Sequence, residues 1–168
     1  MSTIQEELEK IKKSIIKIEG YIKPDVEPQT PQEEMLALAK KYVGTDASPN
    51  DVAPDELGCA ESVSCLIQKI YPNFPTEVST TKLYKRMLAD SRFEKTLKLE
   101  AGNILISPTG YGTGGLAHGH VGICGEDEYI YSNDSYTGTW EKNYTVKSWV
   151  KRYRDIGGYP IYVFKITD

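Results

Sequence analysis

The sequence predicts an α+β fold, in which N-terminal helices pack on a small antiparallel sheet. Two observations support this prediction. Residues 33–42, 59–70 and 80–90 place apolar side chains at helical spacing. After Gly102 the apolar residues come instead in short runs between turn residues, which is typical of strands. Because the helices precede the strands rather than alternate with them, we expect the strands to pair antiparallel.

The N-terminal segment differs from the rest of the chain. Its apolar residues recur at alternating steps of four and three, as in the seam of a coiled coil: Ile4, Leu8, Ile11, Ile15, Ile18 and Ile22. We predict a heptad helix over residues 1–23, which either joins copies of the chain into a homo-oligomer through residues 4–22 or folds back onto its own domain. Residues 24–32 hold three prolines and predict a semi-rigid linker. The folded domain is therefore expected over residues 33–168.

Local signals place the elements of this domain. The helix at 33–42 is ended by Gly44, and the helix at 59–70 is ended by Pro72. A third helix is expected at 80–90. Strands are expected at 103–107, 120–124, 129–132 and 160–166, with a short helix at 146–153.

The composition argues against several classes of function. A net charge of −4 and the lack of a long basic run argue against a nucleic-acid partner. No apolar stretch is long enough for a membrane span. The N-terminus lacks a signal-peptide pattern, so we expect synthesis in the cytoplasm, followed by release through lysis or carriage in a virion. An odd count of three cysteines predicts reduced thiols rather than a disulfide framework.

Two residues have the properties of a nucleophile and its base. Cys59 lies at the predicted start of a helix, where unpaired amides lower the pKa of a thiol. Gly58 leaves the Cys59 amide open to approach, so that it can bind an oxyanion. His120 begins a predicted strand. An imidazole next to a thiol can take the thiol proton and so turn the sulfur into a nucleophile. The sequence therefore predicts a catalytic Cys59–His120 pair, with His118 as the lesser candidate for the base.

A catalytic base needs a third polar group to orient it, and the strand at 129–132 ends beside one. Asn133 is our candidate for this role. Asp134 would do the same work, so the choice between them stays open, and a plain polar turn is the structural alternative. Cys65 lies six positions after Cys59, about 240° around the helix, and is expected in the core.

A zinc site is a competing interpretation of the same region. His118, His120 and Cys124 have a spacing that puts all three on one face of a strand, but the sequence offers no obvious fourth ligand. We expect the chemistry to need neither metal nor cofactor.

Four segments together resemble the papain-like cell-wall hydrolases, namely the NlpC-type peptidases and the CHAP amidases, especially those of bacteriophages. These segments are residues 58–60, 101–106, 119–124 and 132–138, the last followed by Trp140. The resemblance extends over residues 33–166 and implies a papain-like fold. It also implies that Cys59 attacks an amide carbonyl, that His120 carries the proton and that Asn133 holds His120. An acyl-enzyme would then be hydrolysed by water.

The predicted function is therefore that of a cysteine-dependent peptidoglycan hydrolase, either an amidase or an endopeptidase, whose partner is peptidoglycan or its stem peptide. Two alternatives stay open. One is a non-catalytic, oligomeric module of a phage or host assembly that keeps the fold, and the other is a papain-like enzyme that acts on a protein. The glycine-rich loop at 107–119 is expected to gate the cleft.

Overall fold

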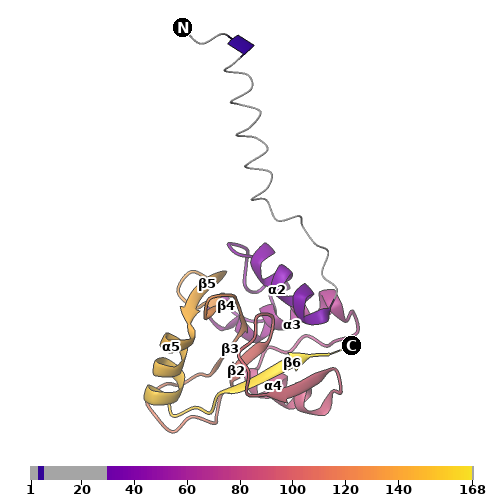
Figure 1. The fold of residues 1–168 in the computed structure, drawn as a ribbon. Coiled ribbons are helices and arrows are strands. Elements are labelled where there is room, and N and C mark those ends of the chain that lie inside the picture. Colours follow the sequence, from indigo (N-terminus) through magenta and orange to yellow (C-terminus); the bar gives the residue numbers. More distant parts are fainter. Residues whose placement is uncertain (1–3, 6–29, 168) are drawn as a thin grey trace.

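The fold is an antiparallel sheet with helices packed on both faces (Figure 1). This computed structural model describes residues 4–5 and 30–167. The elements follow in the order α2 (Pro31–Lys41), the 3-10 helix η1 (Asp55–Leu57), α3 (Cys59–Ile70), α4 (Thr80–Ala89), β1 (Phe93–Thr96), β2 (Ile104–Ser107), β3 (His120–Cys124), β4 (Tyr129–Asp134), β5 (Thr139–Thr145), α5 (Val146–Trp149), the π-helix η2 (Val150–Ile156) and β6 (Tyr162–Ile166). The predicted α+β class is confirmed.

Helix α2 begins where the sequence supplies a cap. The Thr30 hydroxyl accepts a hydrogen bond from the amide of Glu33 at 3.2 Å, and the Glu33 carboxylate accepts one from the amide of Thr30 at 3.1 Å. Pro31 occupies the first turn, where its missing N–H costs nothing. The helix therefore includes the last two residues of the predicted linker. The predicted heptad helix, its oligomer seam and the rest of the linker lie outside the described residues, apart from Ile4, Gln5 and the cap residue Thr30.

Helix α3 is the central helix of the domain. Its first six residues are all buried, and Val63 and Ile67 are fully enclosed between α2, α4 and the sheet. Burial of each such aliphatic side chain contributes about 2 kcal/mol to folding. The loop before α3 is held by the buried Glu61, whose carboxylate accepts the amides of Asn50 at 3.0 Å and Ala53 at 2.7 Å. This clamp fixes the start of α3 and thus the position of its first residue.

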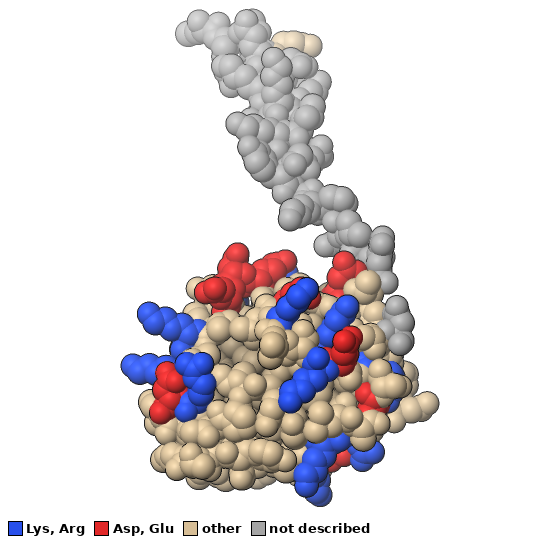
Figure 2. Space-filling model, turned by 60° about the horizontal axis from the view of Figure 1, so that its bottom comes forward, with Lys and Arg blue, Asp and Glu red and all other residues tan. Residues whose placement is uncertain are grey.

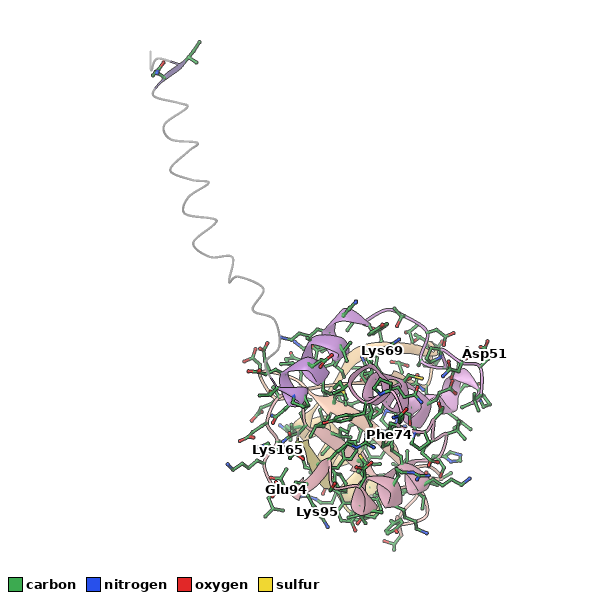
Figure 3. The ribbon with its side chains drawn as sticks, turned by 90° about the vertical axis from the view of Figure 1, so that its right-hand side faces the viewer. Asp51, Lys69, Phe74, Glu94, Lys95 and Lys165 are labelled. Carbon is green, nitrogen blue, oxygen red and sulfur yellow. The ribbon has the colours of Figure 1, made fainter. Side chains whose placement is uncertain are left out.

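The strands run in the spatial order β1-β6-β2-β3-β4-β5, and every neighbouring pair is antiparallel. The four predicted strands correspond to β2, β3, β4 and β6, whereas β1 and β5 were not predicted. Both are edge strands. On β1, Glu94 lies opposite Lys165 of β6, and Figure 3 shows this charged edge with Lys95 beside it. Charged side chains on an edge strand discourage pairing with another chain.

The two faces of the sheet bury separate apolar cores. Val121 and Ile123 of β3 belong to the core beneath α3 and α4, whereas Cys124 belongs to the core beneath α5 and η2. His120 lies on the same face as Cys124, because side chains alternate along a strand. His120, at the start of β3, therefore lies on the face covered by α5 and η2. The first residue of α3, a helix that covers the opposite face, lines the same cavity as His120.

Acidic and basic side chains are interspersed on the face drawn in Figure 2. None of the helices within the described ranges is both long enough and apolar enough to cross a bilayer.

Candidate active site

Cys59 and His120 line the same cavity, which has a volume of about 330 Å³. Its wall is formed by η1 with the start of α3, the loop before β3 with the first residue of β3, the turn after β4, and η2. The remaining lining residues are Glu56, Leu57, Leu116, Ala117, His118, Gly119, Ser135, Arg152 and Tyr153. The structure thus brings together two residues that lie 61 positions apart in the chain, as the papain-like arrangement requires. Asn133 is not part of this lining.

The position of Cys59 is set by a close approach of the backbone. Gly58 is the N-cap of α3, and a Cβ atom there would lie 2.7 Å from the carbonyl oxygen of Ala47 and 2.4 Å from the hydroxyl of Ser48. A side chain at position 58 would therefore push the start of the helix away. The Cys59 sulfur faces the amide of Val121, the residue that follows His120, as well as the amide of Ala60. The thiol thus lies against the first peptide of β3.

The thiol of Cys59 is protonated at neutral pH. Burial raises its pKa from 9.0 to about 11, although the facing backbone amides act in the opposite direction. The side chain is only 7% exposed, and the loss of hydration outweighs the amides. The prediction that the helix start lowers this pKa is therefore wrong for the closed site seen here.

His120 is fixed by aromatic rings. Its imidazole stacks on Trp149 with centroids 5.2 Å apart and on Tyr153 at 5.5 Å, and Tyr144 packs against it at 5.8 Å. Trp149 is itself held, because its indole N–H donates to the hydroxyl of Ser107 at 3.3 Å. The ring therefore has little freedom to rotate within its pocket.

The imidazole of His120 is neutral in this environment. Burial is the main cause that lowers its pKa to about 4, and the positive charge of Arg152 lowers it further. The main-chain carbonyl of Asn133 and the charge of Asp134 act in the opposite direction. Among the described residues, Nε2 is buried and has no hydrogen-bond partner. We therefore assign the proton to Nδ1, which then donates to the main-chain carbonyl of Asn133. Nε2 then carries a buried lone pair that no donor of the described residues occupies.

Asn133 meets the imidazole through its main chain rather than its side chain. Its side-chain amide donates to the carbonyl of Asp55 at 2.8 Å and so ties β4 to η1. Strand alternation accounts for this, because Ser132 pairs with Gly122 on the face of His120 and Asn133 points to the other face. The carboxylate of Asp134 accepts the amide of Tyr136 at 2.8 Å and caps the turn.

The other candidates lie apart from the pair. His118 is exposed at the rim of the cavity. Cys124 lies four strand residues from His120, about 13 Å away at the usual rise. No three His, Cys, Asp or Glu side chains gather as metal ligands in the described part of the chain, so the zinc interpretation is set aside. Cys65 is half-buried rather than in the core, and accepts a hydrogen bond from Asn50. All three cysteines are free.

Sequence reasoning did not identify several residues of the site. The aromatic cage of Tyr144, Trp149 and Tyr153 and the cation Arg152 all follow the catalytic motifs in the chain. One signal was present, since Trp149 and Tyr153 are four positions apart in a predicted helix and so share a face. Their partner on the sheet could not be read from that spacing.

No protein-family model and no curated protein matches the chain. Among solved structures, the fold is similar to that of a chain in the crystal structure of the type VI native effector–immunity complex Tae3–Tai3 from Ralstonia pickettii. The TM-score is 0.52 and the identity 17%, over 82% of this chain and 98% of that chain. At this identity the similarity concerns the fold, which it supports over nearly the whole length of the other protein.

Proposed function

We propose that the chain is a cysteine hydrolase that cleaves an amide bond of peptidoglycan, with Cys59 as nucleophile and His120 as general base. One observation carries the proposal: Cys59 and His120 line the same cavity, and the Cys59 thiol faces the amide of Val121, the residue that follows His120. The fold similarity to a chain of an effector–immunity complex supports an effector-like hydrolase, for which an immunity protein is the analogous partner.

The neutral resting pair determines how the first step proceeds. The sulfur attacks the amide carbon while Nε2 of His120 accepts the thiol proton, so that charge develops only as the new C–S bond forms. The carbonyl of Asn133 accepts from Nδ1–H and stabilises the imidazolium. The amides of Cys59 and Ala60, at the start of α3, are positioned to donate to the oxyanion.

The second half of the reaction uses the same groups in reverse. The imidazolium returns its proton to the leaving nitrogen as the C–N bond breaks, which leaves a thioester on Cys59. Nε2 then takes a proton from water as the water oxygen attacks the thioester carbon. Breakdown of this second intermediate releases the carboxylate product and restores the Cys59 thiol.

The direct test is digestion of purified sacculi by the full chain. The wild type should release soluble fragments, and Cys59→Ala should reduce the rate by at least about 10³-fold, because the nucleophile is lost. Cys65→Ala is the matched control, since that thiol lies on another side of α3, and should stay within about twofold. Mass spectrometry of the fragments identifies the bond. Undiminished digestion by Cys59→Ala would contradict the proposal.

A second function is favoured by one feature, the enclosed and protonated state of the Cys59 thiol. This second function is that of a non-catalytic module that keeps the fold. In such a module the Cys59 thiol would stay buried and protonated whether or not a substrate is present. It predicts no release from sacculi by the wild type, and no hydrolysis of protein substrates.

A further inference from the structure

Arg152 is a cation in the wall of the candidate active site whose countercharge the described part of the chain does not supply. The other arginines there each have a carboxylate: Arg86 pairs with Glu77, Arg92 with Asp90 and Arg154 with Asp155. Arg152 has instead the phenol groups of Tyr144 and Tyr153 as its neighbours. Glu56 lines the same cavity, but no ion pair joins it to Arg152.

The π-helix η2 accounts for the position of this guanidinium. Tyr153 turns inward to stack on His120, and Arg152, the preceding residue, lies at the cavity with its Cζ atom 5.7 Å from the Tyr153 ring centroid. π-helical turns are rare and occur often at functional sites. Here the turn places the aromatic support of the base and a cation side by side.

Building on the proposed function, we propose that Arg152 binds a carboxylate of the substrate next to the amide that Cys59 attacks. The substrate class is then a stem peptide with a free carboxylate beside the scissile bond, in preference to one in which that carboxylate is amidated. A guanidinium can grip a carboxylate with two parallel hydrogen bonds, which gives both affinity and orientation. Stem peptides offer such groups, since their D-glutamyl residue is linked through the side chain and leaves its α-carboxylate free.

The same contact would act on the base. The groups that face His120 are Arg152 from η2, Asp134 from β4, and the rings of Tyr144, Trp149 and Tyr153. Of these groups, Arg152 is the one whose positive charge disfavours the protonated imidazole and so lowers the pKa of His120. A docked carboxylate compensates its charge, and so makes His120 a stronger base only when the substrate is in place.

Binding to the full-length Cys59→Ala protein tests the proposal without turnover. The probes are L-Ala-γ-D-Glu-L-Lys and its α-amide, L-Ala-γ-D-isoglutaminyl-L-Lys, measured by calorimetry. The acid should bind at least tenfold more tightly than the amide. Adding Arg152→Gln should reduce this preference below threefold. Arg154→Gln is the matched control, because it removes a cation from the same π-helix outside the cavity, and should leave the preference unchanged.

Three outcomes overturn the proposal: equal binding of acid and amide, no binding of either peptide, or a preference that survives Arg152→Gln. A spectroscopic readout adds independent support, since NMR titration should show a higher imidazole pKa for His120 in Arg152→Gln. Failure of this proposal and of the proposed function are distinguishable. Digestion of sacculi that depends on Cys59 but ignores amidation refutes only the carboxylate contact, whereas an Arg152-dependent preference without any digestion refutes only the hydrolase.

Discussion

One buried side chain, that of His120, should make acid destabilise the native state. The imidazole has a pKa of about 4 in the folded chain, against 6.5 as its ordinary value. Between these values the unfolded chain binds a proton that the folded chain refuses, so stability falls as the pH falls. The contribution is complete above pH 6.5 and is lost as the pH drops toward 4.

The size of the effect follows from the shift. At 1.36 kcal/mol per pKa unit, the full shift corresponds to about 3 kcal/mol, of which about 2 kcal/mol is already lost at pH 5. That loss is a large part of the stability of an ordinary domain. The contribution comes from burial, because the His120 side chain is only 7% exposed.

Urea unfolding at a series of pH values between 4.5 and 8 measures this contribution. The free energy of unfolding of the wild type should fall toward acid more steeply than that of His120→Phe, in which an uncharged ring fills the site. His118→Gln should follow the wild type. The comparison cancels the carboxylates, which titrate in all three proteins. Parallel curves for wild type and His120→Phe, or an imidazole pKa near 6.5 by NMR, would refute the reasoning.

Three further predictions concern the surroundings of the pair. Gly119→Ala should cost about 3 kcal/mol in urea unfolding, because its Cβ would lie 1.9 Å from a carbonyl oxygen of β2, whereas Gly115→Ala, with open space around it, should change stability by less than about 0.5 kcal/mol. Glu61→Gln should cost about 1–3 kcal/mol, since the carboxylate holds three loop amides, and an unchanged urea midpoint would contradict this. Iodoacetamide followed by mass spectrometry should label Cys65 well before Cys59, because burial raises the pKa of both thiols but only Cys65 is partly exposed to the reagent; the reverse order would show an open site at Cys59.

The helices and inner strands could be predicted from the sequence because burial leaves a periodic pattern. The predicted helix at 59–70 and the strand at 120–124 coincide with α3 and β3. The edge strands β1 and β5 could not be found in this way, since each is largely polar and half-exposed and its pairing partner decides its conformation. The helix predicted at 146–153 is present, but from Val150 onward it is a π-helix, which the apolar pattern does not distinguish.

In the candidate site, too, some residues can be recognised from the local sequence, whereas other contacts depend on how distant elements pack. Cys59 and His120 are recognisable because each occupies a local position with chemical meaning, the start of a helix and the start of a strand. The contact of Asn133 depends on the register of β4, which decides whether its carbonyl or its amide side chain meets the imidazole. The position of Arg152 at the cavity depends on the π-helix η2, which follows α5. Neither contact leaves a signal in the sequence, because both are consequences of packing between elements distant in the chain.

The protonation state links these observations. A sequence motif predicts which groups meet, but burial decides the charge they carry when they meet. At Cys59 and His120 the structure favours a neutral thiol and a neutral imidazole, so in the proposed mechanism the proton moves during the attack rather than before it. The buried lone pair of Nε2 is then the acceptor, and any group that compensates Arg152 helps the transfer. Under the two proposals, the site is weakly reactive when empty and becomes reactive when a carboxylate-bearing substrate fills it.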